Sequence, residues 1–124
     1  MSTFPEFRTM SVQLIVPDLE RSIDFYTGLL GFAVEFRYED FYAGLYRDGH
    51  SIHLKSGTPT PEERLNRREN EHLDLLFSVR NIEHAYERWL NDPAAEIIVP
   101  LRSMPYGKEF YVADPDGYLL GFLE

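Results

Sequence analysis

The amino-acid sequence predicts an α+β fold made of two βαβββ modules, whose curved mixed β-sheets form a cleft and carry their helices on the outside. Two observations point to this fold. Apolar residues alternate along short segments that are separated by two amphipathic helical patterns, and the order of these patterns occurs twice. A chain of 124 residues has room for one hydrophobic core. We therefore expect a single domain, residues 1–124.

The first module is predicted over residues 8–56. Asp18 is expected to be the N-cap of a helix that ends at Gly31, because Asp accepts hydrogen bonds from the first helical N–H groups and glycine tolerates a left-handed C-cap. Asp48 and Gly49 predict a tight hairpin turn between the last two strands. Strands are predicted over residues 10–16, 32–38, 41–47 and 50–55.

The second module is predicted over residues 71–124, with Asn81 as the N-cap of its helix, which runs through Asn91. Its strands are predicted over residues 72–79, 96–99, 109–113 and 118–123, with a turn at 114–117. Residues 57–70 between the modules contain two prolines and several charges. We interpret them as an exposed, mobile connection, which either covers a ligand or has no contact with one.

The two halves align residue by residue: residues 16–20 with 79–83, and Asp48-Gly49 with Asp116-Gly117. Successive strand residues point to opposite faces, and the uniformly apolar set should pack on the helices. The mixed set should then line the cleft. Pairing across the two turns adds tyrosines from the first module, together with Phe110 and Val112 from the second. The predicted ligand-binding residues are Ser11, Gln13, Tyr42, Tyr46, His53, Lys55, His72, Asp74, Phe110 and Gly121.

Composition excludes several kinds of protein. Without cysteine there is no disulfide framework, thiolate metal site or cysteine nucleophile. A net charge of −9 would repel a phosphate backbone, so no nucleic-acid partner is expected. No apolar run reaches the roughly 20 residues that cross a bilayer, and the first ten residues lack the pattern of a signal peptide. We expect no membrane partner and a cytoplasmic location.

Two motifs resemble the glyoxalase, bleomycin resistance and dioxygenase proteins of the vicinal oxygen chelate superfamily. Residues 16–32, with Val16-Pro17-Asp18-Leu19-Glu20 and Leu29-Leu30-Gly31-Phe32, resemble the opening of these proteins. Residues 110–118, with Asp114-Pro115-Asp116-Gly117, resemble their closing hairpin. The resemblance implies the fold already predicted, and a homodimer.

In metal-dependent members of this superfamily, the first and last strand of each module each supply a ligand. The resemblance places these four positions at Ser11, His53, Asp74 and Gly121, and the repeat agrees. Glycine has no side-chain donor and serine is a weak ligand, so no metal cofactor is expected. A minority alternative is a divalent metal at His53, His72 and Asp74, although a histidine in a strand is ordinarily a hydrogen-bonded wall residue. A Ser11, His53, Asp74 nucleophilic triad lacks any recognisable oxyanion hole.

Our first hypothesis is therefore a metal-independent, bleomycin-resistance-like protein that binds a small aromatic or cationic molecule. The second is an enzyme, a lyase, isomerase or dioxygenase, in which His53 acts as acid or base and Asp74 orients it. A protein with neither ligand nor reaction is the third. Metal analysis of purified protein separates the first two.

Overall fold

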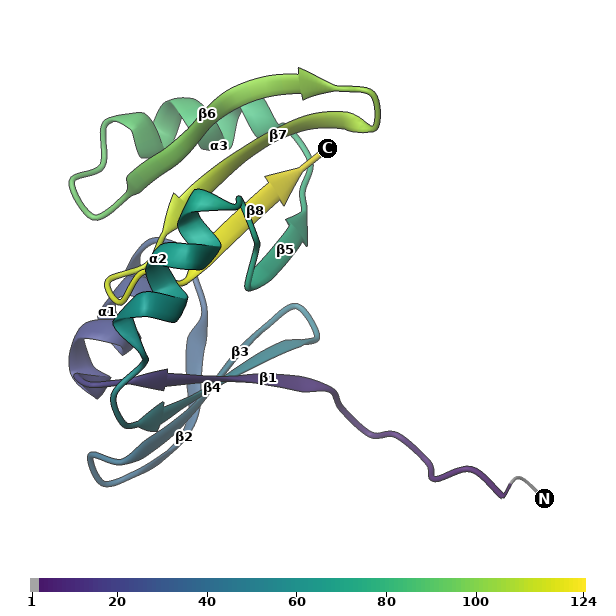
Figure 1. Ribbon diagram of the computed structural model, residues 1–124. Coiled ribbons are helices and arrows are strands. Elements are labelled where there is room, and N and C mark those ends of the chain that lie inside the picture. The colour runs from purple at the N-terminus through teal and green to yellow at the C-terminus, as the bar shows by residue number, and fades with distance from the viewer. Residues whose placement is uncertain (1–2) are drawn as a thin grey trace. The chain divides into compact units, whose positions relative to one another are not determined.

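The computed structural model describes residues 3–124, which form two four-stranded sheets and three helices (Figure 1). The α+β prediction is confirmed. Contacts divide the chain into two compact units, unit 1 up to Thr58 and unit 2 from Pro59 to Glu124, and each is described by itself. The elements are β1 (Ser11–Val16), α1 (Leu19–Gly28), β2 (Ala33–Tyr38), β3 (Tyr42–Arg47), β4 (His50–Ser56), α2 (Pro61–Glu69), β5 (Leu75–Ser78), α3 (Ile82–Leu90), β6 (Glu96–Met104), β7 (Gly107–Ala113) and β8 (Leu119–Leu123).

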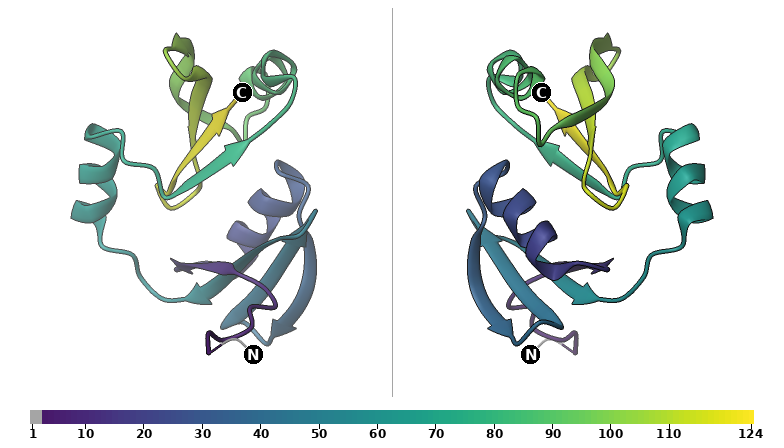
Figure 2. Two further views of the ribbon diagram at one scale, coloured as in Figure 1. Left: turned by 90° about the vertical axis from the view of Figure 1, so that its right-hand side faces the viewer. Right: turned by 90° about the vertical axis from the view of Figure 1, so that its left-hand side faces the viewer.

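Unit 1 is a βαβββ module with α1 on one face of its sheet (Figure 2). The strand order is β1-β4-β3-β2, in which β1 and β4 run parallel and the other pairs antiparallel. Leu14, Val16 and Leu54 are almost fully buried, and so are Ile23 and Tyr26 of α1. The alternation of apolar residues along the strands therefore identified the helix-facing side of this sheet correctly.

The helix α1 begins as predicted. Asp18 has an extended backbone, and its carboxylate accepts a hydrogen bond of 3.1 Å from the backbone N–H of Arg21. The helix ends at Gly28, and Gly31 then adopts a φ of +74°, a left-handed conformation that glycine reaches without steric cost. The sequence signals at both ends of this helix are confirmed.

Unit 2 repeats the same topology, with strand order β5-β8-β7-β6, a parallel β5–β8 pair and α3 against β6 and β7. Its core contains aromatic rings. Phe110 and Phe122 stack at 5.1 Å between ring centroids, and Trp89 of α3 meets both edge-on. The predicted internal repeat is confirmed, although β5 is shorter than expected and β6 continues to Met104.

The start of α3 differs from the prediction. Asn81 occupies the N-cap position, but its φ is +56° and, within the described chain, its side chain makes no capping hydrogen bond. Glu124 performs this function instead. Its two carboxylate oxygens accept hydrogen bonds of 3.0 Å from the backbone N–H groups of Asn81 and Ile82. A carboxylate also suits the positive end of the helix dipole.

The connection between the modules also differs from the prediction, because residues 61–69 form α2. Pro61 lies in the first turn, where its missing N–H costs nothing. Glu62 and Glu63 stand in the first turn and Arg67 and Arg68 in the last, which complements the helix dipole. All residues of α2 are described, and none of them is buried.

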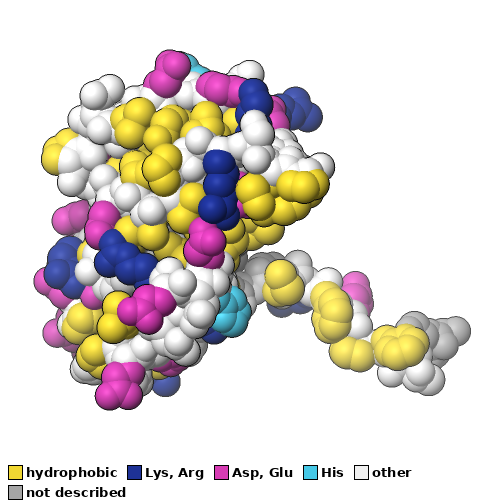
Figure 3. Space-filling model, turned by 45° about the horizontal axis from the view of Figure 1, so that its top comes forward, with side chains coloured by type: hydrophobic (Ala, Val, Ile, Leu, Met, Phe, Trp, Pro, Cys, Tyr) yellow, Lys and Arg dark blue, Asp and Glu magenta, His cyan; other side chains and the backbone are white. Residues whose placement is uncertain are grey.

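The segment before β1 carries exposed apolar side chains, shown in yellow in Figure 3. Phe7 and Met10 are 87% and 90% exposed. Among the described residues, no helix is both long enough and apolar enough to cross a membrane.

Candidate functional site

The face of the unit 1 sheet that is turned away from α1 brings most of the predicted unit 1 residues together. Gln13, His53 and Gly44 lie side by side on β1, β4 and β3. Across the predicted hairpin turn, Tyr46 pairs with Ser51 and Tyr42 with Lys55, which places both tyrosines on this face. We call this surface the open face; its residues are Ser11, Gln13, Ile15, Phe36, Tyr38, Tyr42, Tyr46, Ser51, His53 and Lys55, each exposed or half-buried.

Three polar side chains of the open face form a hydrogen-bonded chain. The Gln13 amide nitrogen Nε2 donates to the hydroxyl of Tyr42 over 3.1 Å. That hydroxyl lies 2.8 Å from Nδ1 of His53. The three residues come from three adjacent strands, so the sheet register fixes their positions.

Aromatic rings surround this chain. The Phe36 ring lies directly over Gly44, where an added Cβ would come within 2.2 Å of the ring. Phe36 stacks on Tyr42, with ring centroids 6.1 Å apart and planes 9° apart, and meets His53 edge-on at 5.2 Å. Gly44 therefore leaves the space into which the Phe36 ring fits, and the ring in turn packs against His53.

Phe36 and Tyr38 are open-face residues that sequence reasoning missed. The signal that could have found them is strand pairing: Tyr38 pairs with Tyr42 and Phe36 with Gly44, so both lie on the same face as Tyr42. A register irregularity between Val34 and Phe36 shifts the alternation in β2 by one residue. Counting every second residue from Ala33 along an ideal strand therefore places Phe36 and Tyr38 on the face that packs against α1, which is the wrong one.

The remaining predicted residues of unit 1, which are Ser11, Tyr46 and Lys55, lie outside this hydrogen-bonded chain. Ser11 donates a hydrogen bond of 2.9 Å to the Ser51 hydroxyl, so these two serines satisfy each other across β1 and β4. Tyr46 is 44% exposed. Lys55 is exposed and adds a positive charge beside Tyr42 in the sheet register.

In unit 2, the Asp74 carboxylate is fully engaged with cationic and backbone donors. One oxygen, Oδ2, accepts from the Arg64 guanidinium at 2.7 Å and from the backbone N–H of Leu119 at 2.8 Å. The other, Oδ1, lies 3.1 Å from Nη1 of Arg67. The side chain of Asp74 is 8% exposed and that of Arg64 is 11% exposed. Asp74 therefore holds α2, the helix that the sequence analysis had interpreted as a mobile connection.

The other two predicted site residues of unit 2, His72 and the family position Gly121, lack such contacts. His72 is exposed and follows α2, where its backbone N–H donates to the carbonyl of Arg67. Gly121 is buried beneath Leu73, because a Cβ added there would come within 2.5 Å of the Leu73 side chain. The space next to Gly121 is occupied by leucine rather than by a polar group.

Phe110, which was expected on the cleft face of β7, points toward α3 instead. Phe110 is fully buried against Tyr86 and Trp89 of α3, and Val112 faces the same side. Ala113 pairs with Leu119, so the β7–β8 loop is one residue longer than the predicted turn. The Asp114 carboxylate, which accepts from the backbone N–H groups of Asp116 and Tyr118, sets this loop. The additional residue reverses the facing of every side chain on β7.

The corrected register exposes a cluster that sequence reasoning missed. Glu109 is 3% exposed and accepts hydrogen bonds from Arg102 at 2.8 Å and from the Tyr106 hydroxyl at 2.7 Å. Arg102 also binds Glu71 at 2.9 Å. The hydrogen bond to Glu109 raises the pKa of Tyr106, and burial raises the pKa of Tyr111. These contacts join β6 and β7, so the cluster stabilises the β6–β7 hairpin.

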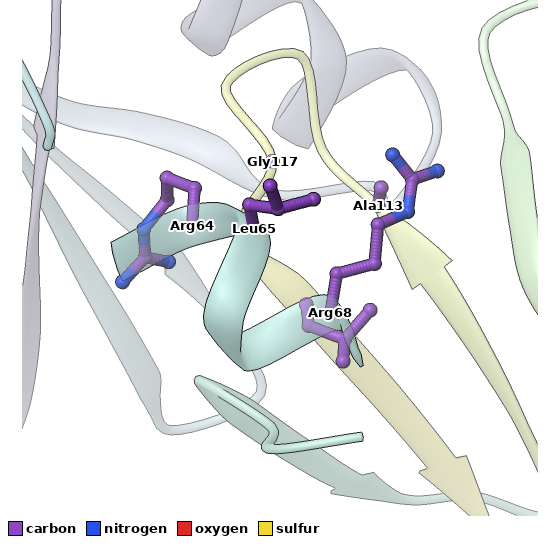
Figure 4. Close-up of a pocket in the computed structure, with 6 residues that line it drawn as sticks. Arg64, Leu65, Arg68, Ala113 and Gly117 are labelled. Atoms are coloured by element: carbon purple, nitrogen blue, oxygen red, sulfur yellow. The ribbon is translucent and has the colours of Figure 1, made fainter. Parts of the chain in front are cut away.

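A pocket of about 170 Å³ lies between α2 and the β7–β8 loop (Figure 4). Arg64 and Arg68 extend from α2 in different directions on either side of Leu65. Arg64 is already paired with Asp74, and Arg68 with Glu96. The pocket therefore has an apolar floor, formed by Ala113 and Leu119, and neutralised cations at its sides.

The residues at the four metal-ligand positions do not suit a divalent metal. Position 121 has no side-chain donor, Ser11 is bonded to Ser51, and both oxygens of Asp74 are held by arginines. Guanidinium groups next to a carboxylate repel a cation and occupy the same lone pairs that it would need. Apart from Asp74, His53 is the one ordinary metal ligand among the four.

Residues 8–122 match the Glyoxalase/Bleomycin resistance protein/Dioxygenase superfamily, and the chain belongs to this family. No curated protein sequence matches the chain.

Solved structures share the fold at low sequence identity. The bleomycin-binding protein of Streptomyces verticillus, complexed with copper(II)-bleomycin, is 21% identical; the match covers 97% of this chain and 98% of that one, with a TM-score of 0.66. The antibiotic-binding protein TnmS3 from a Streptomyces species is 19% identical, with 97% of each chain covered and a TM-score of 0.72. The fosfomycin resistance protein FosX of Listeria monocytogenes is 16% identical, with 96% and 93% covered and a TM-score of 0.71.

Proposed function

We propose that this protein binds a small aromatic or cationic molecule without a metal ion, as bleomycin-resistance-like members of its family do. The observation that carries the proposal is the open face, where the Phe36 ring packs against the hydrogen-bonded chain of Gln13, Tyr42 and His53 and an exposed Tyr46 lies on the same face. Exposed rings that accompany a few fixed polar groups are typical of small-molecule sites. The aromatic faces would provide stacking and cation–π contacts, and binding without reaction would sequester a toxic compound.

The proposed ligand-binding residues in unit 1 are Ser11, Gln13, Tyr42, Tyr46, His53 and Lys55, to which the structure adds Phe36 and Tyr38. In unit 2, the proposed residues are His72, Asp74 and Gly121, of which the buried Gly121 would act only by leaving room for Leu73. Asp74 would act there indirectly, by holding α2. Phe110 is excluded by its burial against α3.

Metal independence is supported by the donor set. Asp74 already carries two guanidinium partners and Gly121 has no donor, so one histidine remains. The alternative is an enzyme of the same superfamily, in which His53 and Asp74 act with or without a metal. It requires an Asp74 carboxylate that is available to the reaction, whereas Asp74 binds α2 and the backbone of Leu119.

The test is a binding titration of protein freed of metal with EDTA. The probes are 1-methylquinolinium, an aromatic cation, 2-methylnaphthalene, a neutral aromatic, and copper(II)-bleomycin. We expect at least one of them to shift the amide NMR signals of β1, β3 and β4. The Tyr42→Ala variant should weaken binding about tenfold, the size of one good aromatic contact. Tyr86→Phe in unit 2 is the matched control and should leave binding unchanged.

Two results would contradict the proposal. The first is the absence of any shift on the open face with all three probes. The second is binding that requires added Zn²⁺, Mn²⁺ or Ni²⁺, which would favour the enzyme.

We also propose that the protein forms a homodimer. Support comes from the segment before β1, where Phe7 and Met10 expose nearly all of their surface. Several exposed apolar side chains within one short segment commonly mark protein–protein contacts. Sedimentation equilibrium should show a dimer, and the Phe7→Ser, Met10→Ser double variant should shift it toward monomer. A wild-type protein that stays monomeric at high micromolar concentration would contradict this part of the proposal.

A further inference from the structure

The Gln13 amide favours one direction for the hydrogen-bonded chain on the open face. The amide nitrogen of Gln13 can only donate, and it donates to the Tyr42 hydroxyl. That hydroxyl carries one proton, which is then free to be donated to Nδ1 of His53, 2.8 Å away. A neutral imidazole that accepts at Nδ1 carries its own proton at Nε2.

The Nε2 atom of His53 is available to a ligand. No residue among 3–124 makes a hydrogen bond to it, since the one hydrogen bond of the ring is at Nδ1. In the described part of the chain, every side-chain nitrogen or oxygen that is shielded from solvent has a hydrogen-bond partner. Because Nε2 of the half-buried His53 has no such partner, it is in contact with solvent. Phe36 and Tyr42 meet the imidazole edge-on, at 5.2 and 5.4 Å, and restrict its rotation.

We infer that His53 offers an N–H donor on the open face, and that the ligand is a planar aromatic compound with a hydrogen-bond acceptor, such as a carbonyl or quinone oxygen. Lys55, which pairs with Tyr42 in the sheet, adds a second donor on the same face. The inference rests on the proposed function and narrows it, because it selects acceptor-bearing aromatics among the aromatic and cationic compounds considered above.

The first experiment needs no ligand. ¹⁵N NMR at a pH where the imidazoles are neutral reports which ring nitrogen carries the proton, and the His53→Gln variant identifies the His53 signals among the four histidines. We expect the proton on Nε2. Tyr42→Phe should convert this single form into a mixture, whereas Tyr46→Phe, on the same face but without a bond to His53, should retain it. A proton on Nδ1 in the wild-type protein would overturn the inference.

The Gln13→Glu variant tests the direction of the chain. A carboxylate only accepts, so the Tyr42 proton would turn toward residue 13 and the Tyr42 oxygen would accept from His53 instead. The proton of His53 should therefore move to Nδ1. The Gln13→Leu variant, which removes both donor and acceptor, is the matched control and should not drive this reversal. An unchanged tautomer in Gln13→Glu would also overturn the inference.

The second experiment compares two probes with the same ring and shape, 2-acetylnaphthalene and 2-isopropenylnaphthalene, which differ by the carbonyl oxygen. We expect the ketone to bind about fivefold tighter, as one net hydrogen bond provides, and Gln13→Glu to abolish the difference. Equal affinities in the wild-type protein would overturn the inference while leaving the proposed function intact. The absence of binding by both would count against the proposed function itself.

Discussion

Arg64 and Asp74 form the contact that fixes α2 to the sheet of unit 2. Their nitrogen–oxygen distance is 2.7 Å, and each side chain is about nine-tenths covered. Because α2 has no buried apolar side chain, this pair and the neighbouring Arg67 replace the apolar contact that usually docks a helix.

Asp74→Asn should therefore loosen α2. The change leaves two arginines without their common carboxylate, and we expect the free energy of unfolding to fall by about 2 kcal/mol. Hydrogen exchange should quicken throughout α2. Glu63→Gln is the control, because Glu63 contacts Arg64 and Arg67 from the exposed side and should contribute well under 1 kcal/mol. Equal effects of the two variants would argue against a buried anchor.

Glu124→Gln should destabilise α3. The variant retains one acceptor oxygen but loses the charge that caps the backbone of Asn81 and Ile82. Loss of a helix cap costs about 1 kcal/mol. Urea unfolding checks the value, and Glu69→Gln, at the far end of α2, is a control for the loss of one surface charge. No change in Glu124→Gln would mean that the cap adds nothing to stability.

Gly44→Ala should disrupt the open face. The new Cβ would meet the Phe36 ring at 2.2 Å, so the ring must leave its place on Tyr42 and His53. We expect a loss of about 2 kcal/mol in the free energy of unfolding and weaker binding of aromatic probes. Gly28→Ala is the matched control, since an added Cβ there meets no described atom within 4 Å beyond its chain neighbours and the backbone of its own helix. Retention of both stability and binding in Gly44→Ala would contradict the packing of Phe36.

Alkaline pH should weaken unit 2 through Tyr106 and Tyr111. The folded protein raises the pKa of each above its usual 10.0, Tyr106 mainly through its hydrogen bond to Glu109 and Tyr111 mainly through burial. A raised pKa contributes stability that is complete below pH 10 and is lost as pH rises through the folded value. Urea unfolding between pH 9 and 11.5 should show this loss, and Tyr106→Phe should reduce its steepness. An identical pH dependence in the variant would refute the assignment.

The internal repeat and the hairpin at Asp48-Gly49 were accessible from sequence because both depend on local rules. Apolar alternation assigned the helix-facing side of β1 and β4, and a two-residue turn fixed the pairing of Tyr46 with Ser51. These features predicted the two βαβββ modules and the β3–β4 pairing, whereas the parallel neighbours β1–β4 and β5–β8 come from the structure.

The errors arose where a specific side-chain contact, rather than apolar alternation or a simple cap signal, decides the local structure. Asp114 adds one residue to the β7–β8 loop and so turns Phe110 into the core. Glu124 replaces the expected cap at Asn81 from 43 residues away. In residues 61–69 the proline was interpreted as a breaker, although at the first turn it favours a helix, and the partner of Arg64 lies outside the segment.

The engagement of Asp74 limits how this chain could change during evolution. The same two oxygens cannot serve both an arginine pair and a metal ion, so the gain of an ion at this position would release α2 from its sheet. A descendant that acquired metal chemistry would first need a different way to hold that helix, such as apolar residues in place of its exposed ones.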